Sequence, residues 1–342
     1  MRDEAELDDA LASPSPDLVA DMAELDGDLL VLGAGGKMGP SLVRLALRAV
    51  AEAGTGAKVI AVSRFGDERL AHELRQLGAD LVRADVTDER ELAALPDAAN
   101  VVYMVGSKFG AAGQEHHTWL VNTHLPGRVA ERFRGARISA FSTGNVYPLV
   151  PVDDGAPTEE HPPGPIGEYA MSCLGRERVL EHFSHRHGTP MAVLRLNYAI
   201  DLRYGVLLDI GHAVREGRPV DLAMGHVNVV WQGYANEVAL RALRHATSPP
   251  LLLNLTGPET LSVRQVAEAF GEHFGVEPVF TGSPAPTALL SNAGKVHALF
   301  GYPRVPAGRL IAWTAAWLRD GGPVWDKPTH FQRRDGDFTR RG

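Results

Sequence analysis

The chain of 342 residues is long enough for one large domain or for two domains that share a cleft. Its 44% apolar and 22% charged residues are typical of a globular protein, and its one cysteine excludes an internal disulfide. No apolar run approaches the ~20 residues of a membrane span, and no apolar signal core stands near the N-terminus. We therefore expect a cytoplasmic protein that is not bound to a membrane.

The first 28 residues form an acidic arm. They carry ten acidic residues and one basic residue, Arg2, so that this segment has a net charge of −9 and the rest of the chain about +1, within a formal total of −8. The nearly neutral remainder argues against nucleic-acid binding, which needs a basic face. We expect the arm to be solvated, with a short helix possible from Pro16 to Leu25.

Beyond the arm, apolar runs of strand length alternate with longer amphipathic segments. This alternation is typical of an α/β fold with a doubly wound parallel sheet of the Rossmann type. The predicted strands are Leu29–Leu32, Lys58–Val62, Asp80–Val82, Asn100–Val105, Arg137–Phe141 and Met191–Leu196. The predicted helices among them span residues 40–53, 67–77, 113–134 and 167–187.

The alternation loosens after residue 198, which predicts a smaller C-terminal α/β lobe. Strand-like runs at 227–231 and 251–255 each precede a predicted helix, at 234–246 and 261–274, and two more helices are expected at 287–299 and 307–319. We divide the chain into an arm (1–28), a dinucleotide-binding domain (29–197) to which some later segments return, a substrate-binding lobe (198–320) and an irregular tail (321–342).

The stretch LLVLGAGGKMGP places three glycines between the first strand and the first helix. Gly33, Gly36 and Gly39 have a spacing close to the dinucleotide fingerprint, in which glycines permit a tight turn and let a pyrophosphate approach the helix N-terminus. Lys37 and Met38 lie within the same loop. We therefore predict that residues 33–39 bind a dinucleotide cofactor, with Lys37 able to contact phosphate.

The second and third strands end in polar residues that bear on the choice of cofactor. The second ends at Ser63-Arg64, and an arginine there can pair with a 2′-phosphate, so we predict NADP with NAD as the alternative. Arg64 could equally be a solvated residue that stacks on adenine. Asp85, followed by Val86, is placed to accept from the adenine amino group or, alternatively, to cap the next helix.

Taken together, these motifs resemble the extended short-chain dehydrogenase/reductase family, the NAD-dependent epimerase/dehydratase group, from about Leu29 to about Trp317. The resemblance also rests on Asn122, the run Ser142–Tyr147, Tyr169 and the run Arg195–Tyr198. It implies an enzyme with a nicotinamide cofactor that acts on a sugar hydroxyl or carbonyl. It also implies a homodimer formed through the helices at 113–134 and 167–187.

The resemblance assigns roles by position. Thr143 matches the hydroxyl residue that holds the reacting oxygen, and Tyr169 matches the acid/base that moves its proton. Asn197 and Tyr198 match the segment that passes the nicotinamide, and Asn122 matches a structural asparagine. A positioned acid/base is needed because the oxygen must lose its proton as hydride leaves the attached carbon.

One departure concerns the residue four positions after Tyr169, where the family has a lysine and this chain has Cys173. The lysine lowers the tyrosine pKa, and each unit left uncorrected costs about 1.4 kcal/mol. An unaided tyrosine stays neutral, which favours carbonyl reduction over alcohol oxidation. Cys173 is either a catalytic thiol or a small apolar filler. Arg176 is either a replacement cation or a solvated or interface residue.

Other departures bear on the substrate and the reaction. Gly144 and Asn145 stand where dehydratases carry an acid pair, so we do not expect water elimination; Asn145 is a candidate substrate residue. Lys108, after the fourth strand, is expected to open onto the cleft as a substrate residue or cation, and His116 and His117 are further candidates for substrate contact. The histidines lack zinc-site spacing, so no metal is predicted.

The C-terminal lobe also departs from the family. Val227, Asn228, Gly233 and Tyr234 stand where enzymes for nucleotide sugars carry an Arg-Asp pair and two aspartates. A sugar or a similar small polyhydroxylated molecule is therefore the expected substrate, in place of a nucleotide sugar.

These observations lead to an NAD(P)-dependent oxidoreductase or epimerase for a carbohydrate-like substrate. Two alternatives remain open at this point. One is a non-redox isomerase or lyase that keeps the bound nucleotide as a scaffold. The other is a non-catalytic NAD(P)-binding protein.

Overall fold

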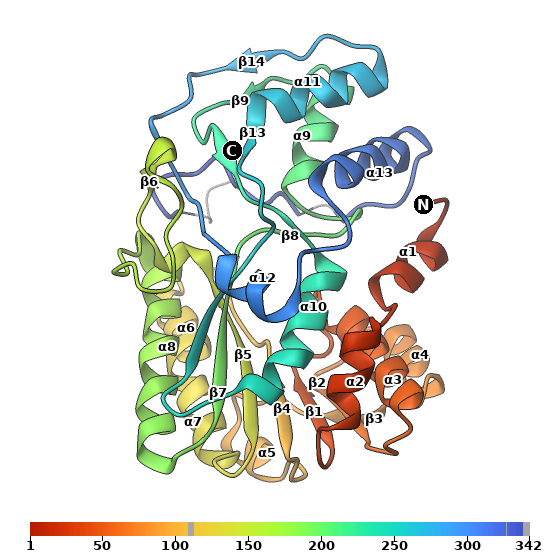
Figure 1. Ribbon diagram of the computed structural model, residues 1–342, viewed down its shortest axis with the longest axis vertical. Coiled ribbons are helices and arrows are strands. Elements are labelled where there is room, and N and C mark those ends of the chain that lie inside the picture. Colours follow the sequence, from red (N-terminus) through yellow and green to blue (C-terminus); the bar gives the residue numbers. More distant parts are fainter. Residues whose placement is uncertain (109–112, 326, 338–342) are drawn as a thin grey trace.

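A seven-stranded parallel sheet forms the centre of the molecule (Figure 1). The computed structural model describes residues 1–108, 113–325 and 327–337. The strands lie in the order β12 (Leu251–Leu255), β7 (Met191–Leu196), β5 (Arg137–Thr143), β4 (Asn100–Tyr103), β1 (Leu29–Leu32), β2 (Val59–Ser63) and β3 (Asp80–Arg83). This arrangement confirms the predicted α/β fold class.

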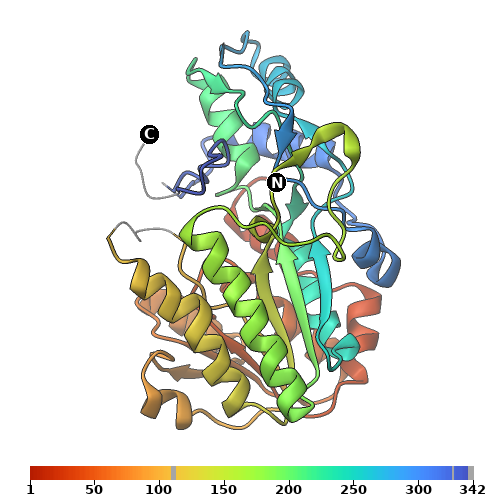
Figure 2. The same cartoon turned by 90° about the vertical axis from the view of Figure 1, so that its left-hand side faces the viewer.

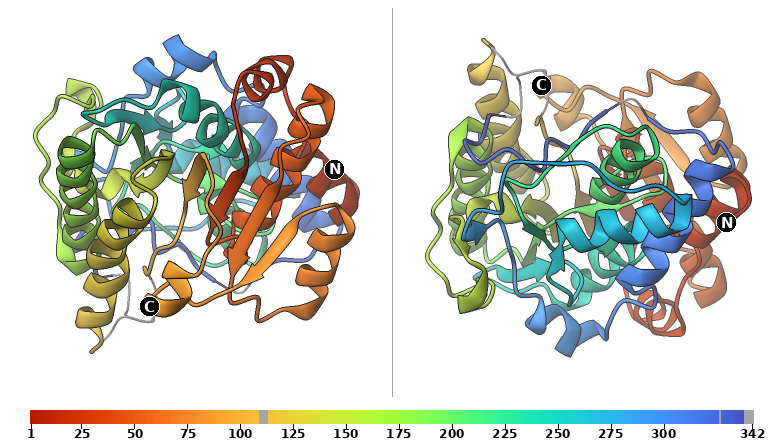
Figure 3. Two further views of the ribbon diagram at one scale, coloured as in Figure 1. Left: turned by 90° about the horizontal axis from the view of Figure 1, so that it is seen from below. Right: turned by 90° about the horizontal axis from the view of Figure 1, so that it is seen from above.

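The sheet is buried on both faces, which explains why its strands read as continuous apolar runs. In β1, Leu29 and Val31 pack into one core while Leu30 and Leu32 pack into the other. Helices α7 (Leu125–Arg132) and α8 (Gly167–His187) cover one face, and α3 (Gly39–Ala53) and α10 (Gln232–Arg241) cover the other (Figure 3). The shorter helices α4 (Glu68–Gln76) and α5 (Glu89–Ala93) follow β2 and β3.

The single helix predicted at 113–134 is interrupted. Helix α6 (Glu115–Trp119) passes through a π-helical turn, η1 (Leu120–His124), before α7 begins. Pro126 has no N–H to donate to the carbonyl of Asn122 four residues earlier. The Nε of Arg176 donates to that carbonyl instead, at 3.2 Å. A contact with α8 therefore compensates for the bond that proline removes.

Of the two later strand predictions, the one at 251–255 is confirmed with its bounds and the one at 227–231 was changed by tertiary pairing. The run at 251–255 forms β12 and joins the main sheet beside β7, with Leu253 opposite Leu194. The run predicted at 227–231 divides into β10 (His226–Val227) and β11 (Val230–Trp231), which pair with β13 (Leu261–Ser262) and β8 (Ala199–Ile200) respectively.

A smaller lobe lies over the carboxyl ends of the strands (Figure 2). It contains α9 (Val206–Arg215), β9 (Val220–Asp221), α11 (Val263–Phe274), β14 (Phe280–Thr281) and α13 (Ala307–Arg319). The helix predicted at 287–299 is shorter, because Thr287–Ala288 forms β15 against β6 (Val150–Pro151) and α12 covers only Gly294–Phe300. The boundary near residue 197 stays a prediction. Among the described residues, no helix is long and apolar enough to cross a bilayer.

The prediction of a solvated N-terminal arm was wrong. Residues 1–28 form two helices, α1 (Glu4–Leu11) and α2 (Pro16–Ala23), of which the second was predicted as a possibility. Leu7, Leu11 and Leu18 are buried against α3 and α10 in the larger core. Burial of these apolar side chains supplies the free energy that docks the arm.

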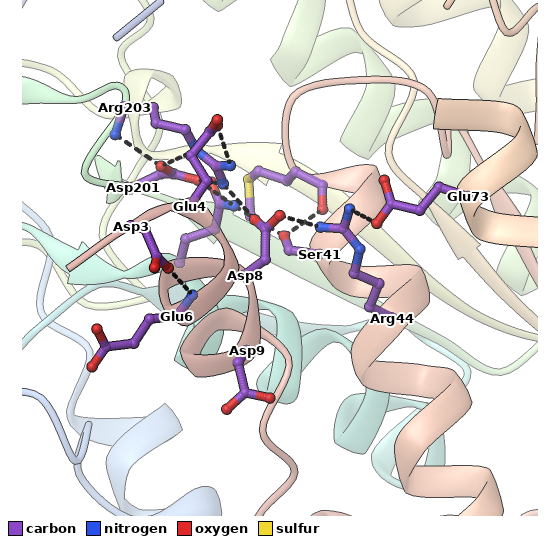
Figure 4. Close-up of polar contacts among 12 residues, drawn as sticks. Asp3, Glu4, Glu6, Asp8, Asp9, Ser41, Arg44, Glu73, Asp201 and Arg203 are labelled. Atoms are coloured by element: carbon purple, nitrogen blue, oxygen red, sulfur yellow. Dashed lines mark hydrogen bonds and ion pairs between the residues drawn. The ribbon is translucent and has the colours of Figure 1, made fainter. Parts of the chain in front are cut away.

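The acidic residues of the arm meet arginines of the body. Asp8 lies between Arg44 of α3 and Arg203, at 2.9 Å from each guanidinium (Figure 4). Asp21 pairs with Arg241 of α10 at 2.6 Å. The excess of acid that suggested a solvated segment is thus neutralised by basic residues far away in the sequence.

The described part of the tail has no helix or strand after α13, as predicted. Residues 327–337, which we call the C-terminal strap, return between the small lobe and the upper end of α8 (Figure 2). Gly336 lies against the backbone of Ile166 and Gly167, at the start of α8.

Candidate active site

The glycine loop has the geometry of a nucleotide cradle. Gly33 adopts a φ of +93°, and its carbonyl accepts a hydrogen bond from the N–H of Gly36 at 2.9 Å. A Cβ atom on Gly39 would lie 2.2 Å from the carbonyl oxygen of Ala34, so that position tolerates glycine alone. These constraints hold the turn between β1 and α3 flat against the end of the sheet.

A cavity of about 350 Å³ opens beside this loop. Its walls are formed by the carboxyl ends of β1, β2, β3 and β4, the edge where open α/β sheets bind ligands. The predicted cofactor residues Gly33, Gly36, Ser63, Arg64, Asp85 and Val86 all line it, together with His117, which was expected with His116 as a candidate for substrate contact. Lys37, Met38, Gly39, Asn197 and Tyr198 do not line it. The cavity therefore lies where the predicted cofactor residues of the first three strands converge.

Arg64 and Asp85 face each other in this cavity. The Arg64 side chain is 80% exposed, and its guanidinium lies 3.9 Å from the Asp85 carboxylate. Asp85 also accepts from the hydroxyl of Thr87 at 2.7 Å, and this bond leads the effects that hold the pKa of Asp85 below its ordinary value. Helix α5 is capped by Asp88 and not by Asp85, which leaves the Asp85 carboxylate turned to the cavity.

Tyr169 and Thr143 come together at the carboxyl end of β5. The hydroxyl of Tyr169 hydrogen-bonds with the side chains of Thr143 and Cys173. Asn145 fixes Thr143 by donating from both its backbone N–H and its Nδ2 to Oγ1, at 3.2 and 2.9 Å. Burial raises the pKa of Tyr169 far above its ordinary value, so the phenol is protonated at neutral pH.

Cys173 packs as a small apolar residue. It is buried among Val146, Tyr147 and the ring of Tyr169. Burial raises the pKa of its thiol, which keeps the sulfur protonated and removes its nucleophilic form. This environment favours the filler interpretation over a catalytic thiol.

Arg176 is neither solvated nor at an interface. It is buried, and its guanidinium donates to the carbonyls of Phe141 and Val105 at 2.6 and 3.1 Å. It also binds the side chain of Asn122, which joins the loop after β4 to α8 through Ser107 and Ser172. Arg176 and Asn122 therefore have a structural role, since they hold the loop after β4 against β5 and α8.

Two cations lie near Tyr169, the guanidinium of Arg176, whose charge acts to lower the pKa of Tyr169, and an ammonium from the loop after β4. The Nζ atom of Lys108 lies 5.6 Å from the centroid of the Tyr169 ring, on an element unrelated to α8. Burial of the ammonium group lowers the pKa of Lys108 to about 8. A positive charge therefore stands close to Tyr169 although the position four residues along the helix carries none.

A second lysine approaches from the glycine loop. Lys37 is an exposed residue, yet its Nζ atom lies 3.3 Å from the centroid of the Tyr204 ring. The packing around this nitrogen and repulsion from Lys108 lower the pKa of Lys37 to about 7. The glycine loop, the loop after β4 and the small lobe therefore bring Lys37 and Lys108 into one region, in which Asp201 and Asp209 also act on Lys37.

A buried polar network supports the end of β5. Glu177 of α8 accepts from Arg195 at 2.7 Å and from the hydroxyl of Ser142 at 2.6 Å. Arg195 also donates to the hydroxyl of Tyr147 at 2.6 Å, which in turn contacts Asn254 of β12. Sequence reasoning had found Arg195 and Tyr147 only as motif positions, because the partners lie on four separate elements.

Two more predicted positions have informative surroundings. Asn197 is buried, and its Nδ2 has no hydrogen-bond partner among the described residues. A Cβ atom on Gly144 would lie 3.0 Å from the hydroxyl of Ser291 and 3.2 Å from the Cβ of Asn197. Tyr198 has a φ of +48° and lines a small cavity together with Asn145.

The structure does not bring His116 to this site. It lines a groove on the outer face of α6, α7 and α8, whereas its neighbour His117 lines the cofactor cavity. In the small lobe, Val227 and Asn228 are buried, and Asn228 is occupied by hydrogen bonds to Glu259, Thr260 and Ser291. Tyr234 donates to the carbonyl of Gly301.

Comparison with known proteins bears directly on this geometry. The sequence model of the NAD dependent epimerase/dehydratase family matches residues 29–199, which is half of the chain and spans the glycine loop, Thr143 and Tyr169. This chain belongs to that family. Its members use an NAD(P) dinucleotide. No match was found among curated protein sequences.

Several solved structures share the fold. UDP-glucose 4-epimerase from Thermotoga maritima, in a structure with UDP-glucose, has a TM-score of 0.70 at 19% identity, over 86% of this chain and 99% of that one. The dTDP-glucose 4,6-dehydratase DesIV from Streptomyces venezuelae, with NAD and TYD bound, has 0.71 at 20%, over 86% and 97%. Pal from Bacillus thuringiensis has 0.70 at 16%, over 85% and 99%.

Proposed function

We propose that this protein is an NAD(P)-dependent oxidoreductase or epimerase that acts on a hydroxyl or carbonyl group of a carbohydrate-like molecule. The observation that supports it most is the pairing of the Tyr169 and Thr143 hydroxyls at the carboxyl end of β5. The nicotinamide, when bound, supplies or accepts a hydride. Thr143 would orient the substrate oxygen, and Tyr169 would exchange a proton with it.

Carbonyl reduction is the favoured direction. A phenol whose pKa is raised by burial is a poor base but remains available as a proton donor. The ammonium of Lys108, 5.6 Å from the ring centroid, would stabilise the phenolate that forms as the proton leaves. Lys108 would thus supply from a loop the charge that the family resemblance places at the position of Cys173.

Elimination of water is disfavoured by the residues after Thr143. Gly144 carries no side chain and Asn145 carries no acid, and both are adjacent to the reacting position. A side chain at 144 would meet Ser291 and Asn197 at 3.0 to 3.2 Å, so this position lacks room for a carboxylate. The site therefore supports hydride and proton transfer better than dehydration.

The cofactor that we propose is NADP, with NAD as the alternative. Arg64 projects into the cavity from the end of β2, where a 2′-phosphate would lie. The carboxylate of Asp85 at 3.9 Å opposes a phosphate at this place, so the preference depends on how the pair rearranges. If Arg64 selects NADP, Arg64→Ala weakens NADPH binding about tenfold and leaves NADH binding unchanged in calorimetry.

The proposed substrate is a sugar or sugar derivative without a nucleotide. The positions that the resemblance assigns to the phosphate-binding Arg-Asp pair are Val227 and Asn228, and both are buried and engaged in packing or hydrogen bonds. A nucleotide diphosphate would find no cation at this place.

A homodimer formed through α6, α7 and α8 is also proposed. These helices lie side by side on one face of the molecule (Figure 2) and carry the exposed apolar side chains of Trp119, Leu120 and Met171. A groove of about 830 Å³ between them is lined by Leu120, Val179 and Phe183, among others. A second copy is the occupant that the family resemblance implies.

The test of the activity is a screen of small aldoses, ketoses and sugar acids with NADPH and NADH. Absorbance at the nicotinamide band would report net redox, and NMR of the products would report epimerisation, which regenerates the cofactor. We expect turnover that falls by at least about 100-fold in Tyr169→Phe, because the proton donor is lost. Tyr302→Phe, at an exposed tyrosine that lines none of the cavities described above, is the matched control.

Two outcomes would support the alternatives. Turnover that persists in Tyr169→Phe, with no change in the cofactor during the reaction, would indicate the non-redox isomerase or lyase. Tight cofactor binding without turnover of any compound would indicate the non-catalytic protein, for which the raised pKa of Tyr169 is the supporting observation.

A further inference from the structure

Helix α1 of the N-terminal arm reaches a short turn in the body of the protein. The carboxylate of Asp8 stands 2.9 Å from the guanidinium of Arg203, which belongs to the turn Asp201–Tyr204 (Figure 4). Two backbone hydrogen bonds, of 3.1 and 2.9 Å, join the first and last residues of this turn to each other. The arm is therefore tied to a closed turn that is far away in the sequence.

The arginine of this turn is surrounded by carboxylates. Arg203 is buried and donates to both carboxylate oxygens of Asp201, which is fully buried, at 3.0 and 2.8 Å. Glu4, one helical turn before Asp8 on α1, adds a more exposed carboxylate at 3.4 Å. Since charge-assisted contacts hold a guanidinium in one orientation, the carboxylates of the arm help to set where the turn lies.

One contact leads from this turn to a side chain of the glycine loop. The ring of Tyr204 faces the ammonium group of Lys37, whose Nζ atom lies 3.3 Å from the ring centroid, within the range of a cation–π interaction. The charge of Asp201 also acts on the pKa of Lys37, which places the carboxylate near the same group. Both ends of the turn therefore act on the residue that follows Gly36.

A second contact leads to the backbone of the same loop. The carbonyl oxygen of Met38 accepts a hydrogen bond from the hydroxyl of Ser41 at 3.0 Å. That hydroxyl accepts from Nε2 of Gln232 at 3.0 Å, and the same Nε2 donates to Asp201 at 3.5 Å. Ser41, Gln232 and Asp201 are all buried, so water does not compete for these groups. The turn thus reaches two successive residues of the glycine loop by separate routes.

We propose that Asp8 is a positioning residue for the cofactor, because through Arg203 it holds the glycine loop in the conformation that receives the dinucleotide. Backbone N–H groups bind phosphates only within a narrow range of distance and angle, so a loop that shifts loses affinity. None of residues 1–28 lines the cofactor cavity, and the arm acts on binding from outside it. This inference rests on the proposed function in one respect, which is that a nicotinamide dinucleotide binds at residues 33–39.

The first test is calorimetric binding of NADPH and NADH to the full chain. Asp8→Asn removes the charge that faces Arg203 and should weaken binding of the preferred dinucleotide at least about fivefold. Asp8→Glu keeps the charge and should keep most of the affinity. The matched control is Asp9→Asn, which breaks an exposed ion pair between α1 and Arg48 of α3 and should bind as the wild type does.

A second control separates the two partners of Asp8. The other oxygen of its carboxylate lies 2.9 Å from Arg44 of α3. Arg44→Gln removes that partner and leaves Arg203 in place, so it should change the affinity by less than about twofold. An effect as large as that of Asp8→Asn would overturn the route through Arg203.

The second test observes the loop in the absence of cofactor. Hydrogen exchange followed by mass spectrometry should be at least about fivefold faster in Asp8→Asn than in the wild type for the peptide that contains the bonded amides of Gly36 and Gly39. Peptides from α11 in the small lobe should exchange at the same rate in both proteins. Asp9→Asn should match the wild type in both regions.

A merely structural role of Asp8 gives a different pattern. In that case Asp8→Asn lowers the midpoint of urea unfolding but leaves both the dissociation constant and the exchange of the loop at their wild-type values, which would overturn the inference. A failure of the proposed function appears elsewhere, as a wild-type chain that binds neither nucleotide. The exchange measurement would then still decide whether Asp8 holds the loop.

Discussion

At the scale of single residues, the chemistry of this site depends on which cation lies near Tyr169. Its helical neighbour Cys173 is buried and protonated, and the charge of Arg176 acts to lower the pKa of Tyr169 although its guanidinium also binds backbone carbonyls. Lys108 places its Nζ atom 5.6 Å from the ring centroid, with a pKa of about 8. The ammonium form predominates at neutral pH and is lost as the pH rises through this value.

The first prediction concerns the pH dependence of carbonyl reduction. Tyr169 keeps its proton throughout, because its pKa is raised, so the cation of Lys108 sets the upper limit. The rate should be level below pH 8 and fall about tenfold per unit above it. Lys108→Met should lower the rate and abolish this inflection in a kcat/KM profile. Lys58→Met, at an exposed lysine, should keep the inflection. A Lys108→Met profile like that of the wild type would exclude a role of Lys108 in proton transfer.

The second prediction concerns the buried pair of Glu177 and Arg195. Their side chains are only 4% and 2% exposed, so Glu177→Gln leaves an uncompensated cation in the core. The free energy of unfolding should fall by about 3–5 kcal/mol in urea titrations. Glu181→Gln, on the same helix, breaks an exposed pair with Arg178 and should cost about 0.5 kcal/mol or less. Equal effects of the two substitutions would mean that the buried network contributes no more to stability than an exposed ion pair does.

At the scale of secondary-structure elements, the acidic arm is the main departure from expectation. Helices α1 and α2 bury one face of leucines and present carboxylates to arginines of α3 and α10. The two effects act together, because ion pairs at the edge of an apolar contact orient the helices that burial brings together. The arm is thus a structural part of the layer formed by α3 and α10.

The third prediction follows from that packing. Leu18→Ala should lower the free energy of unfolding by about 2–5 kcal/mol, because it leaves a cavity between α2 and the helices beneath it. Leu77→Ala, at a leucine that is 51% exposed, should change it by about 0.5 kcal/mol or less. Denaturant titration of both variants decides the matter, since a solvated arm would make Leu18→Ala as mild as its control.

At the scale of the whole molecule, two surfaces remain to be assigned to partners. The cleft side is closed by the strap, and the outer side carries the groove of α6, α7 and α8. The structural match covers almost all of each solved structure named above, whereas about one seventh of this chain lies outside each match. The present protein therefore adds segments to a shared fold.

The fourth prediction concerns the oligomeric state. If the groove is a dimer contact, Leu120→Arg should place two charges in the interface and shift the protein to monomer, with a dissociation constant raised by at least about 100-fold. Analytical ultracentrifugation measures this directly. Leu299→Arg, at an exposed leucine of α12, should sediment as the wild type does. A wild-type protein that is monomeric at all concentrations would refute the dimer.

Much of the fold could be predicted from local sequence. The strands of a doubly covered sheet must be apolar on both faces, so β1 and β7 were found with their observed ends. The glycine loop could be predicted equally well, since Gly33 and Gly39 satisfy local backbone constraints that no other residue meets. Tyr169 and Thr143 were found by their motifs, and the fold brings them together.

The amino-acid sequence by itself determined the sheet, the glycine turn and the placement of the phenol at the start of a helix, because each depends on residues within one or two turns of the chain. Tertiary structure decided what surrounds that phenol. The approach of Lys108, the burial of Arg176, the docking of α1 and the closure by the strap all depend on contacts between distant segments. Their partners are specified by complementary shape and charge across the fold, which no local pattern records.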